Sequence, residues 1–254
     1  MRILPLAVSA VALGLAFTPM AQAQDFDPAA MTDDQRSAFR DEVRAYLLDN
    51  PEVLMEAIGV LESRQADAQT LGDAQMIETN SDAIFNDPMS YVGGNPDGDI
   101  TIVEFMDYRC SYCRKAFPEV EELIATDGNI RFIVKEFPIL GEESVLASRF
   151  AIAVLDVAGS DAYKNVHDAL MQMRGSYTEA SLREIAADAG IDEIDAVIAA
   201  MDSDEVTATI AANHELAQRL QITGTPTFVM SDQMLRGYVP LDAMQQIVGT
   251  AREG

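Results

Sequence analysis

The sequence predicts an α/β domain that carries a long helical insertion and follows an N-terminal helical segment. Residues 99–106 form a dense β-branched and aromatic run, which is typical of a buried strand, and residues 130–137 form a second. Nearly all of residues 142–220 has helical periodicity, within which Thr178 and Ser203 are expected to be helix N-caps and Gly190 a helix stop. Strand patterns return at 227–238 and a helical pattern closes the chain at 241–251. Whether the first two strands run parallel or antiparallel is left open by the sequence.

The first residues indicate export. Met1 and Arg2 give a short positive start, residues 3–17 are almost wholly apolar, and Ala21-Gln22-Ala23 has the small-x-small form of a cleavage site. The apolar run of about 15 residues is shorter than the roughly 20 that span a bilayer as a helix. We therefore expect a signal peptide over residues 1–23, cleaved after Ala23, and a periplasmic protein.

The charge of the chain argues against two classes of partner. Its 254 residues carry a formal charge of −25. Such a surface repels phosphate groups, so we expect neither nucleic acid nor an anionic membrane surface as a partner.

The segment before the main domain has two amphipathic helical patterns. Thr32 and Gln35 have the spacing of a capping box, and Asn50-Pro51 can begin a second helix. Apolar residues then recur at helical spacing, namely Phe39, Val43, Tyr46, Leu47, Leu54, Ile58 and Leu61. Two short helices cannot bury both stripes against each other. The stripes therefore either dock on the main domain or join copies of the chain, and we favour a homo-oligomer through residues 32–65.

These patterns divide the exported chain into two parts. Residues 24–80 are expected to be the oligomerisation segment and a polar, alanine-rich helical linker. Residues 81–254 are expected to be the main domain, with its helical insertion at about 142–220.

The chemistry points to Cys110 and Cys113, the only two cysteines, which lie where the first strand passes into a helix. A Cys-x-x-Cys at a helix start places the first sulfur against unpaired N–H groups and the positive end of the helix dipole, which stabilise a thiolate. The second sulfur lies one turn inside and can close a disulfide ring. We therefore expect Cys110 to attack disulfides and Cys113 to resolve the mixed disulfide, with no cofactor beyond this redox-active pair.

A metal site is the competing interpretation of the cysteine pair. A closed zinc site needs four ligands, and the chain offers only His167 and His214 besides the cysteines. We expect each histidine to be a solvated helix-face residue, and Met171 and Met173 to fill the core rather than bind copper. No metal ligand is therefore predicted.

Glu104 interrupts the first buried strand. A buried carboxylate is costly unless it is paired or exchanges protons, and Lys135 at the end of the neighbouring strand is the natural partner. The alternative is a glutamate at a strand edge that faces water.

Several motifs together resemble the DsbA branch of the thioredoxin superfamily. Residues 101–113, Thr-Ile-Val-Glu-Phe-Met-Asp-Tyr-Arg-Cys-Ser-Tyr-Cys, are very close to the DsbA-like pattern, and Gly-Thr-Pro-Thr-Phe at 224–228 precedes a late strand. Pro118 matches the proline inside the active-site helix of such proteins. The resemblance covers about residues 82–254 and implies a thioredoxin-like fold.

The resemblance also implies roles for particular residues. Pro226 would be the cis-proline beside the cysteines, and with Thr225 it would bind the substrate chain like an added strand. Glu104 falls on the acidic position beneath the active site. Ser111 and Tyr112, between the cysteines, are expected to tune the redox poise and to contact substrate.

Other features are similar to different members of the superfamily. The pair Tyr112-Cys113 and the residue Thr225 before the cis-proline look like those of DsbC-type isomerases, and residues 47–54 are similar to the N-terminal oligomerisation region of ScsC-like proteins. These resemblances imply an oligomeric isomerase or reductase that acts on unfolded or misfolded exported proteins, with a membrane redox partner of the DsbD or DsbB type. The alternatives are a monomeric DsbA-type oxidase and, in a different class, a copper-binding or chaperone module.

Overall fold

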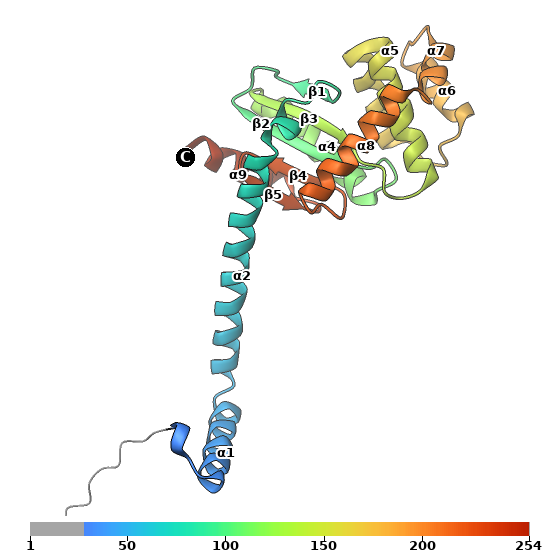
Figure 1. Cartoon of the computed structure of the whole chain (residues 1–254). Helices are drawn as coiled ribbons and strands as arrows, with labels where there is room; N and C mark the ends of the chain where they lie inside the picture. Colours follow the sequence, from blue (N-terminus) through green and yellow to red (C-terminus); the bar gives the residue numbers. More distant parts are fainter. Residues whose placement is uncertain (1–27, 254) are drawn as a thin grey trace, which may run out of the picture. The chain divides into compact units, whose positions relative to one another are not determined.

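The computed structural model describes residues 28–253, so the expected signal peptide lies outside the described residues. The chain forms two compact units that divide between Val60 and Leu61. Figure 1 labels the helices and strands in chain order. Within the described part, no helix is long and apolar enough to cross a membrane.

The described part of the first unit, from residue 28 onward, is helical. A 3-10 turn at Pro28–Ala30 precedes helix α1 (Asp33–Asp49), and helix α2 (Glu52–Thr79) begins in this unit. The predicted capping box is confirmed, because the N–H of Gln35 donates to the Thr32 hydroxyl at 3.3 Å and the N–H of Thr32 to the Gln35 side chain at 3.0 Å. None of the residues of α1 is buried. The exposed large apolar side chains of this unit are Phe39, Val43, Tyr46, Leu48, Leu54, Met55, Ile58 and Val60.

The second unit is built on a five-stranded sheet in the order β1-β3-β2-β4-β5. The strands are β1 (Tyr91–Gly94), β2 (Ile100–Met106), β3 (Ile130–Glu136), β4 (Thr227–Met230) and β5 (Gln233–Arg236). Strands β2 and β3 are parallel, and every other neighbouring pair is antiparallel. The α/β prediction is confirmed, although the short, glycine-containing β1 was not predicted.

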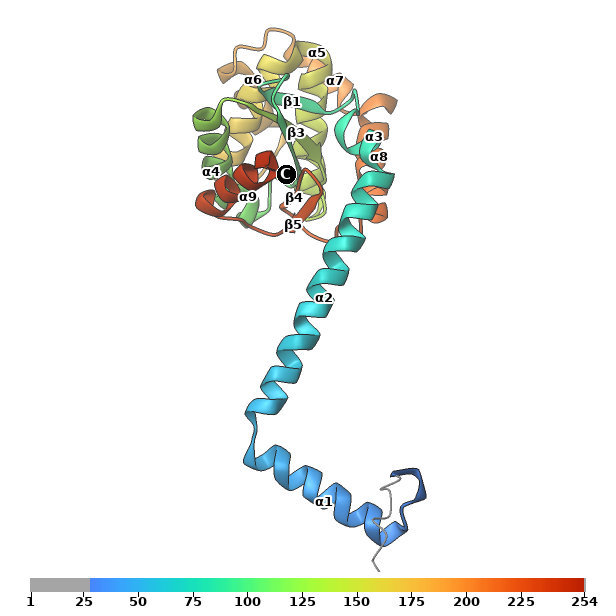
Figure 2. The same ribbon diagram turned by 90° about the vertical axis from the view of Figure 1, so that its left-hand side faces the viewer.

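Helices cover both faces of this sheet. The helices that follow α2 in this unit are α3 (Ser81–Phe85), α4 (Ser111–Asp127), α5 (Glu142–Gln172), α6 (Glu179–Asp188), α7 (Ile194–Ala200), α8 (Asp204–Arg219) and α9 (Leu241–Glu253). Ile102 and Val134 point into the core under α4, α5 and α9, whereas Val103 and Ile133 point into the core under α3 and the end of α8. Figure 2 shows α4 and α9 on one side of the strands and α3 and α8 on the other.

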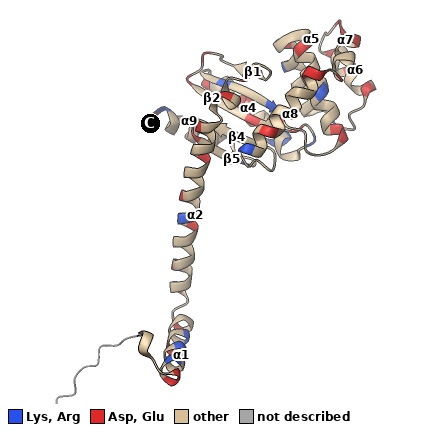
Figure 3. Ribbon diagram, in the orientation of Figure 1, with Lys and Arg blue, Asp and Glu red and all other residues tan. Residues whose placement is uncertain are grey.

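The predicted helical insertion is confirmed as α5 to α8, between β3 and β4. Thr178 and Ser203 cap α6 and α8 as expected. Gly190 follows the end of α6 with φ 74°, and Gly159 interrupts α5 with φ 84°, a conformation that favours glycine. Acidic residues are distributed along α2 and over the insertion, in keeping with the formal charge of −25 (Figure 3).

The second half of α2 belongs to the second unit. Asp73 and Ile77 are buried, and Asp73 accepts two hydrogen bonds from Arg236 at 2.7 and 2.9 Å. Because these contacts join α2 to β5, the division between units lies before the boundary expected at 80/81.

The predicted pairing of Lys135 with Glu104 is wrong. Glu104 lies opposite Val134 in the parallel register, so the side chain of Lys135 points to the other face of the sheet. There the Lys135 ammonium donates to Asp87 at 2.6 Å and to the carbonyl of Ala83 at 3.0 Å. Lys135 therefore holds the segment between α3 and β1 in place and does not neutralise Glu104.

Candidate active site

The two cysteines occupy the start of α4, as the sequence predicts. Cys110 is the N-cap residue, and its Sγ accepts from the N–H of Cys113 at 3.4 Å. Both thiols are free. Cys110 retains 6% of its surface exposed and Cys113 none, so only the first sulfur can be reached from solvent.

The surroundings make these two thiols chemically unequal. A hydrogen bond from the Cys113 thiol has the largest effect on the pKa of Cys110 and lowers it, whereas burial raises it. Further hydrogen bonds, from Thr225 and from the N–H groups of Cys113 and Tyr112, also lower it. The net result is a pKa of about 6 for Cys110. Burial, followed by the interaction with Cys110, raises the pKa of Cys113 far above its ordinary value. At neutral pH the arrangement therefore holds one thiolate and one thiol.

The segment before β4 lies against Cys110. The Thr225–Pro226 peptide bond is cis, as the resemblance implied, and in its protonated form the Cys110 thiol donates to the carbonyl of Thr225 at 3.2 Å. The two segments meet because β2, which leads to Cys110, pairs with β4, which follows Pro226. Ser111 and Tyr112 are exposed, with 60% of Tyr112 open to solvent.

Glu104 lies on the sheet face that carries α4, and it is buried at 3% exposure. Its Oε1 has no hydrogen-bond partner within the described part of the chain. Burial, followed by the charge of Cys110, raises the pKa of Glu104 to about 8. The alternative of a solvent-facing strand-edge glutamate is therefore excluded.

A second buried carboxyl, at Glu136, was not predicted. Its two oxygens accept hydrogen bonds from Tyr108 at 2.8 Å, Tyr163 at 2.7 Å and Ser148 at 2.7 Å. Burial raises the pKa of Glu136, the three hydrogen bonds lower it, and the net result is a pKa of about 7. The alternation of side chains along β3 could have indicated that Glu136 is buried. Glu136 is two residues beyond Val134 and therefore lies on the same face, and Val134 is opposite Glu104.

His167 belongs to the same buried cluster, so its expected place on a solvated helix face is wrong. The ring is 3% exposed, and its Nδ1 lies 3.0 Å from the hydroxyl of Tyr108. Burial lowers the pKa of His167 to about 3, so the ring is neutral at ordinary pH. His167 lies on the buried apolar face of α5, which also carries Tyr163, Leu170 and Met171 at helical spacing. Met171 is buried as core, as expected.

Chemically, this site can exchange disulfides. It holds a partly exposed thiolate at a helix start, a buried thiol one turn away and the backbone segment that leads into β4 beside the first sulfur. Within residues 28–253, no three metal-ligating side chains gather in one place.

Comparison with known proteins places this geometry in a family. The DSBA-like thioredoxin domain matches residues 101–249, and the copper resistance protein ScsC N-terminal domain matches residues 35–68. A thioredoxin-like oxidoreductase from Silicibacter pomeroyi DSS-3 is 43% identical, with a TM-score of 0.64 over 68% of this chain and 98% of that one. Proteus mirabilis ScsC in a transitional conformation is 31% identical, with a TM-score of 0.64 over 88% of this chain and 98% of its own.

A curated relative is much longer than this chain. The Na(+)/H(+) antiporter NhaA 1 of Salinispora arenicola is 27% identical over 165 residues, which cover 65% of this chain and 25% of the antiporter. The chain thus spans about a quarter of the length of that relative. The match over residues 101–249, together with the 43% identity to a solved oxidoreductase, shows that the chain belongs to the family of proteins with a DSBA-like thioredoxin domain.

Proposed function

We propose that this protein is a thiol–disulfide oxidoreductase that acts on exported proteins in the periplasm. The observation that carries the proposal is the inequality of the two thiols at the start of α4. With a pKa of about 6, Cys110 is about nine-tenths thiolate at pH 7, whereas Cys113 stays protonated. An attacking thiolate beside a reserved resolving thiol is what exchange requires.

The proposed reaction has two steps. The Cys110 thiolate attacks one sulfur of a substrate disulfide; that bond breaks, a mixed disulfide forms, and the departing substrate thiolate takes up a proton. Cys113 then loses its proton and attacks Cys110 Sγ, which releases the second substrate sulfur as a thiolate. The substrate disulfide is reduced to two thiols while the enzyme pair is oxidised, and the reverse sequence donates a disulfide.

Glu104 is the proposed acceptor of the Cys113 proton. Its charge contributes to the raised pKa of Cys113, so the two groups interact. With a pKa of about 8, the carboxyl can both take up and release a proton near neutral pH. Since Oε1 makes no hydrogen bond with any described group, it is available for that transfer.

Thr225 and Pro226 form the proposed substrate edge. The segment leads directly into strand β4 and lies against the attacking sulfur, so a client chain could pair with the Thr225 backbone as an added strand. Ser111 and the exposed ring of Tyr112 would contact the client on the other side of Cys110.

We further propose that the active form is a homo-oligomeric isomerase or reductase, joined through residues 32–65. The support is the row of exposed apolar side chains on α1 and α2 and the match of residues 35–68 to the ScsC N-terminal domain. Several thiolates near one client raise their effective concentration during rearrangement. A partner of the DsbD type would keep such an enzyme reduced, whereas one of the DsbB type would oxidise it.

Two assays test these proposals. The purified chain without residues 1–23 should reduce insulin disulfides, and Cys110→Ser should abolish turnover; an inactive parent protein would contradict the proposed function. For the oligomer, deletion of residues 24–60 leaves Asp73 and Ile77 in place in the second unit. The deleted form should be monomeric, retain insulin reduction and lose refolding of scrambled ribonuclease. A parent protein that is already monomeric at micromolar concentration would refute the assembly.

A further inference from the structure

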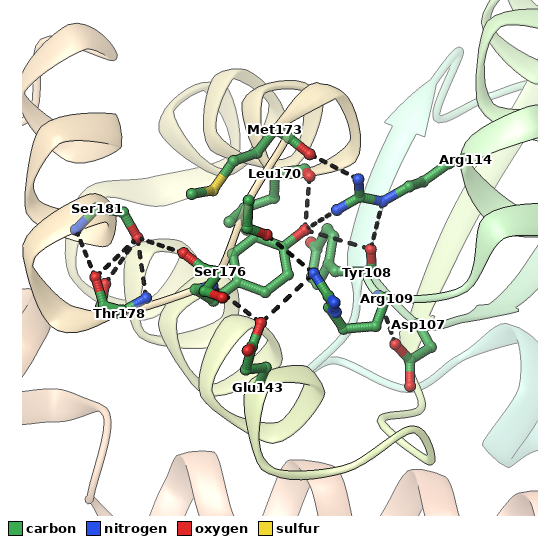
Figure 4. Close-up of polar contacts among 12 residues, drawn as sticks. Asp107, Tyr108, Arg109, Arg114, Glu143, Leu170, Met173, Ser176, Thr178 and Ser181 are labelled. Carbon is green, nitrogen blue, oxygen red and sulfur yellow. Dashed lines mark hydrogen bonds and ion pairs between the residues drawn. The ribbon is translucent and has the colours of Figure 1, made fainter.

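Arg114 bridges the segment that carries both cysteines. It lies on α4, one residue after Cys113, and its guanidinium donates to three acceptors: the carbonyl of Tyr108 at 2.7 Å, the carbonyl of Met173 at 2.6 Å and the hydroxyl of Tyr177 at 2.5 Å (Figure 4). The first bond closes a ring of residues around the cysteine pair. The other two tie that ring to the connection between α5 and α6 in the helical insertion.

Tyr177 is itself held firmly in that connection. It is 2% exposed, its hydroxyl donates to the carbonyl of Leu170 at 2.8 Å, and its N–H donates to Glu143 at 3.1 Å. The guanidinium carbons of Arg109 and Arg114 each lie 5.9 Å from the centre of its ring. The surface that receives Arg114 is therefore an ordered part of the insertion.

Tyr108 is held at its other polar end as well. Its ring is fully buried, and its hydroxyl donates to Glu136 at 2.8 Å while its carbonyl accepts from Arg114. Tyr108 is two residues before Cys110, so both of its polar groups fix the approach of the chain to the attacking sulfur.

We propose that Arg114 is a positioning residue for Cys110, through which the α5–α6 connection (residues 173–178) sets the reactivity of that thiol. This inference deepens the proposed function and rests on it. The Cys110 sulfur accepts from the N–H of Cys113 at 3.4 Å, and this hydrogen bond is one of those that lower the pKa of the Cys110 thiol. A displacement of residues 108–110 from the first turn of α4 would weaken it, because a hydrogen bond depends on distance and angle.

The geometry of arginine is essential to this role. Its planar guanidinium presents five donors in a fixed fork, whereas a lysine ammonium is a point charge on a flexible stem. Lysine at this position would keep the positive charge near Cys110 but could not hold three acceptors in different directions. The substitution Arg114→Lys thus separates positioning from charge.

The test measures the pKa of Cys110 from its rate of alkylation as a function of pH, in Arg114→Lys, Tyr177→Phe and the double variant. We expect each single variant to raise that pKa by about 0.5 to 1, which slows alkylation at low pH about three- to tenfold. Because both changes break the same contact, the double variant should shift less than the sum of the two. Arg183→Lys is the matched control: Arg183 lies on α6 and pairs with Glu179 and Asp195. It should leave the pKa unchanged.

Two results would overturn the proposal: an unchanged pKa in both single variants, or additive shifts in the double variant. If Arg114→Lys does not fold, Tyr177→Phe still decides whether the α5–α6 connection sets the reactivity of Cys110, because the Tyr177 hydroxyl contacts both Arg114 and, at 3.3 Å, the carbonyl of Tyr108. Alkylation requires no disulfide substrate. A parent protein that fails to reduce insulin would therefore refute the proposed function without affecting this test.

Discussion

Replacement of Glu104 by glutamine tests whether this carboxyl is protonated in the folded protein. The group is buried, its Oε1 is unpaired among the described residues, and its pKa is raised from 4.5 to about 8. In the unfolded chain it loses its proton near the ordinary value. Between these two pH values the folded state binds a proton that the unfolded state has released, so the free energy of unfolding falls as the pH rises.

The magnitude follows from the two pKa values. The stability is fully present below pH 4.5, declines by about 1.4 kcal/mol per pH unit above it and stops declining near pH 8. At pH 7 the loss amounts to about 3 kcal/mol. Glutamine cannot ionise and therefore avoids this loss. Any cost of burying its amide is independent of pH and leaves the slope unchanged.

The assay is urea unfolding of both proteins in the reduced state from pH 4.5 to 8. The difference in unfolding free energy, Glu104→Gln minus parent, should grow by about 3 kcal/mol between pH 4.5 and 7. Titration of Cys110 is common to both proteins and largely cancels. Glu122→Gln, the same change at an exposed position of α4, should show no such growth. Parallel curves for parent and Glu104→Gln would mean that the pKa of Glu104 is not raised in the fold, and would refute the value of about 8 on which the proposed proton-acceptor role rests.

Three further predictions concern the same second unit. Alkylation of the reduced protein should occur at Cys110 with a midpoint near pH 6 and leave Cys113 unmodified at neutral pH, as peptide mapping would reveal; equal labelling would contradict the pKa assignment. Thr225→Val removes a hydroxyl that helps to lower the pKa of Cys110, so the alkylation midpoint should rise, and an unchanged midpoint would make that hydroxyl irrelevant. Asp73→Asn should destabilise the unit by about 1–3 kcal/mol, because Arg236 loses a bidentate carboxylate at a partly buried site; thermal unfolding measures this, and no change would mean that α2 is not anchored there.

Sequence patterns sufficed for the parts of the fold that depend on local physics. The strand before Cys110, the helix after it and the caps at Thr32, Thr178 and Ser203 follow from β-branched runs, helical periodicity and side-chain hydrogen bonds to the first turn. The four-residue strand β1 could not be predicted in this way. It forms because β3 offers it an edge, and that edge exists only after the sheet has assembled.

The buried charges show where the same reasoning fails. Pairing Glu104 with Lys135 required only that they lie on neighbouring strands, but the register of β2 and β3 places them on opposite faces. The same register brings Glu136 onto the face of Glu104, where Tyr108 and Tyr163 supply its hydrogen bonds. Such partners come from distant parts of the chain, so only the tertiary structure identifies them.

The division of roles between the two cysteines is tested most directly by trapping. Cys113→Ser removes the resolving thiol, so mixed disulfides with client proteins should accumulate on Cys110 in an oxidising periplasm and disappear on reduction. Cys110→Ser is the matched control, because the remaining Cys113 is fully buried and its pKa is raised far above neutral. We therefore expect covalent client adducts with Cys113→Ser and none with Cys110→Ser. Adducts on Cys113 alone, or none with either variant, would contradict it.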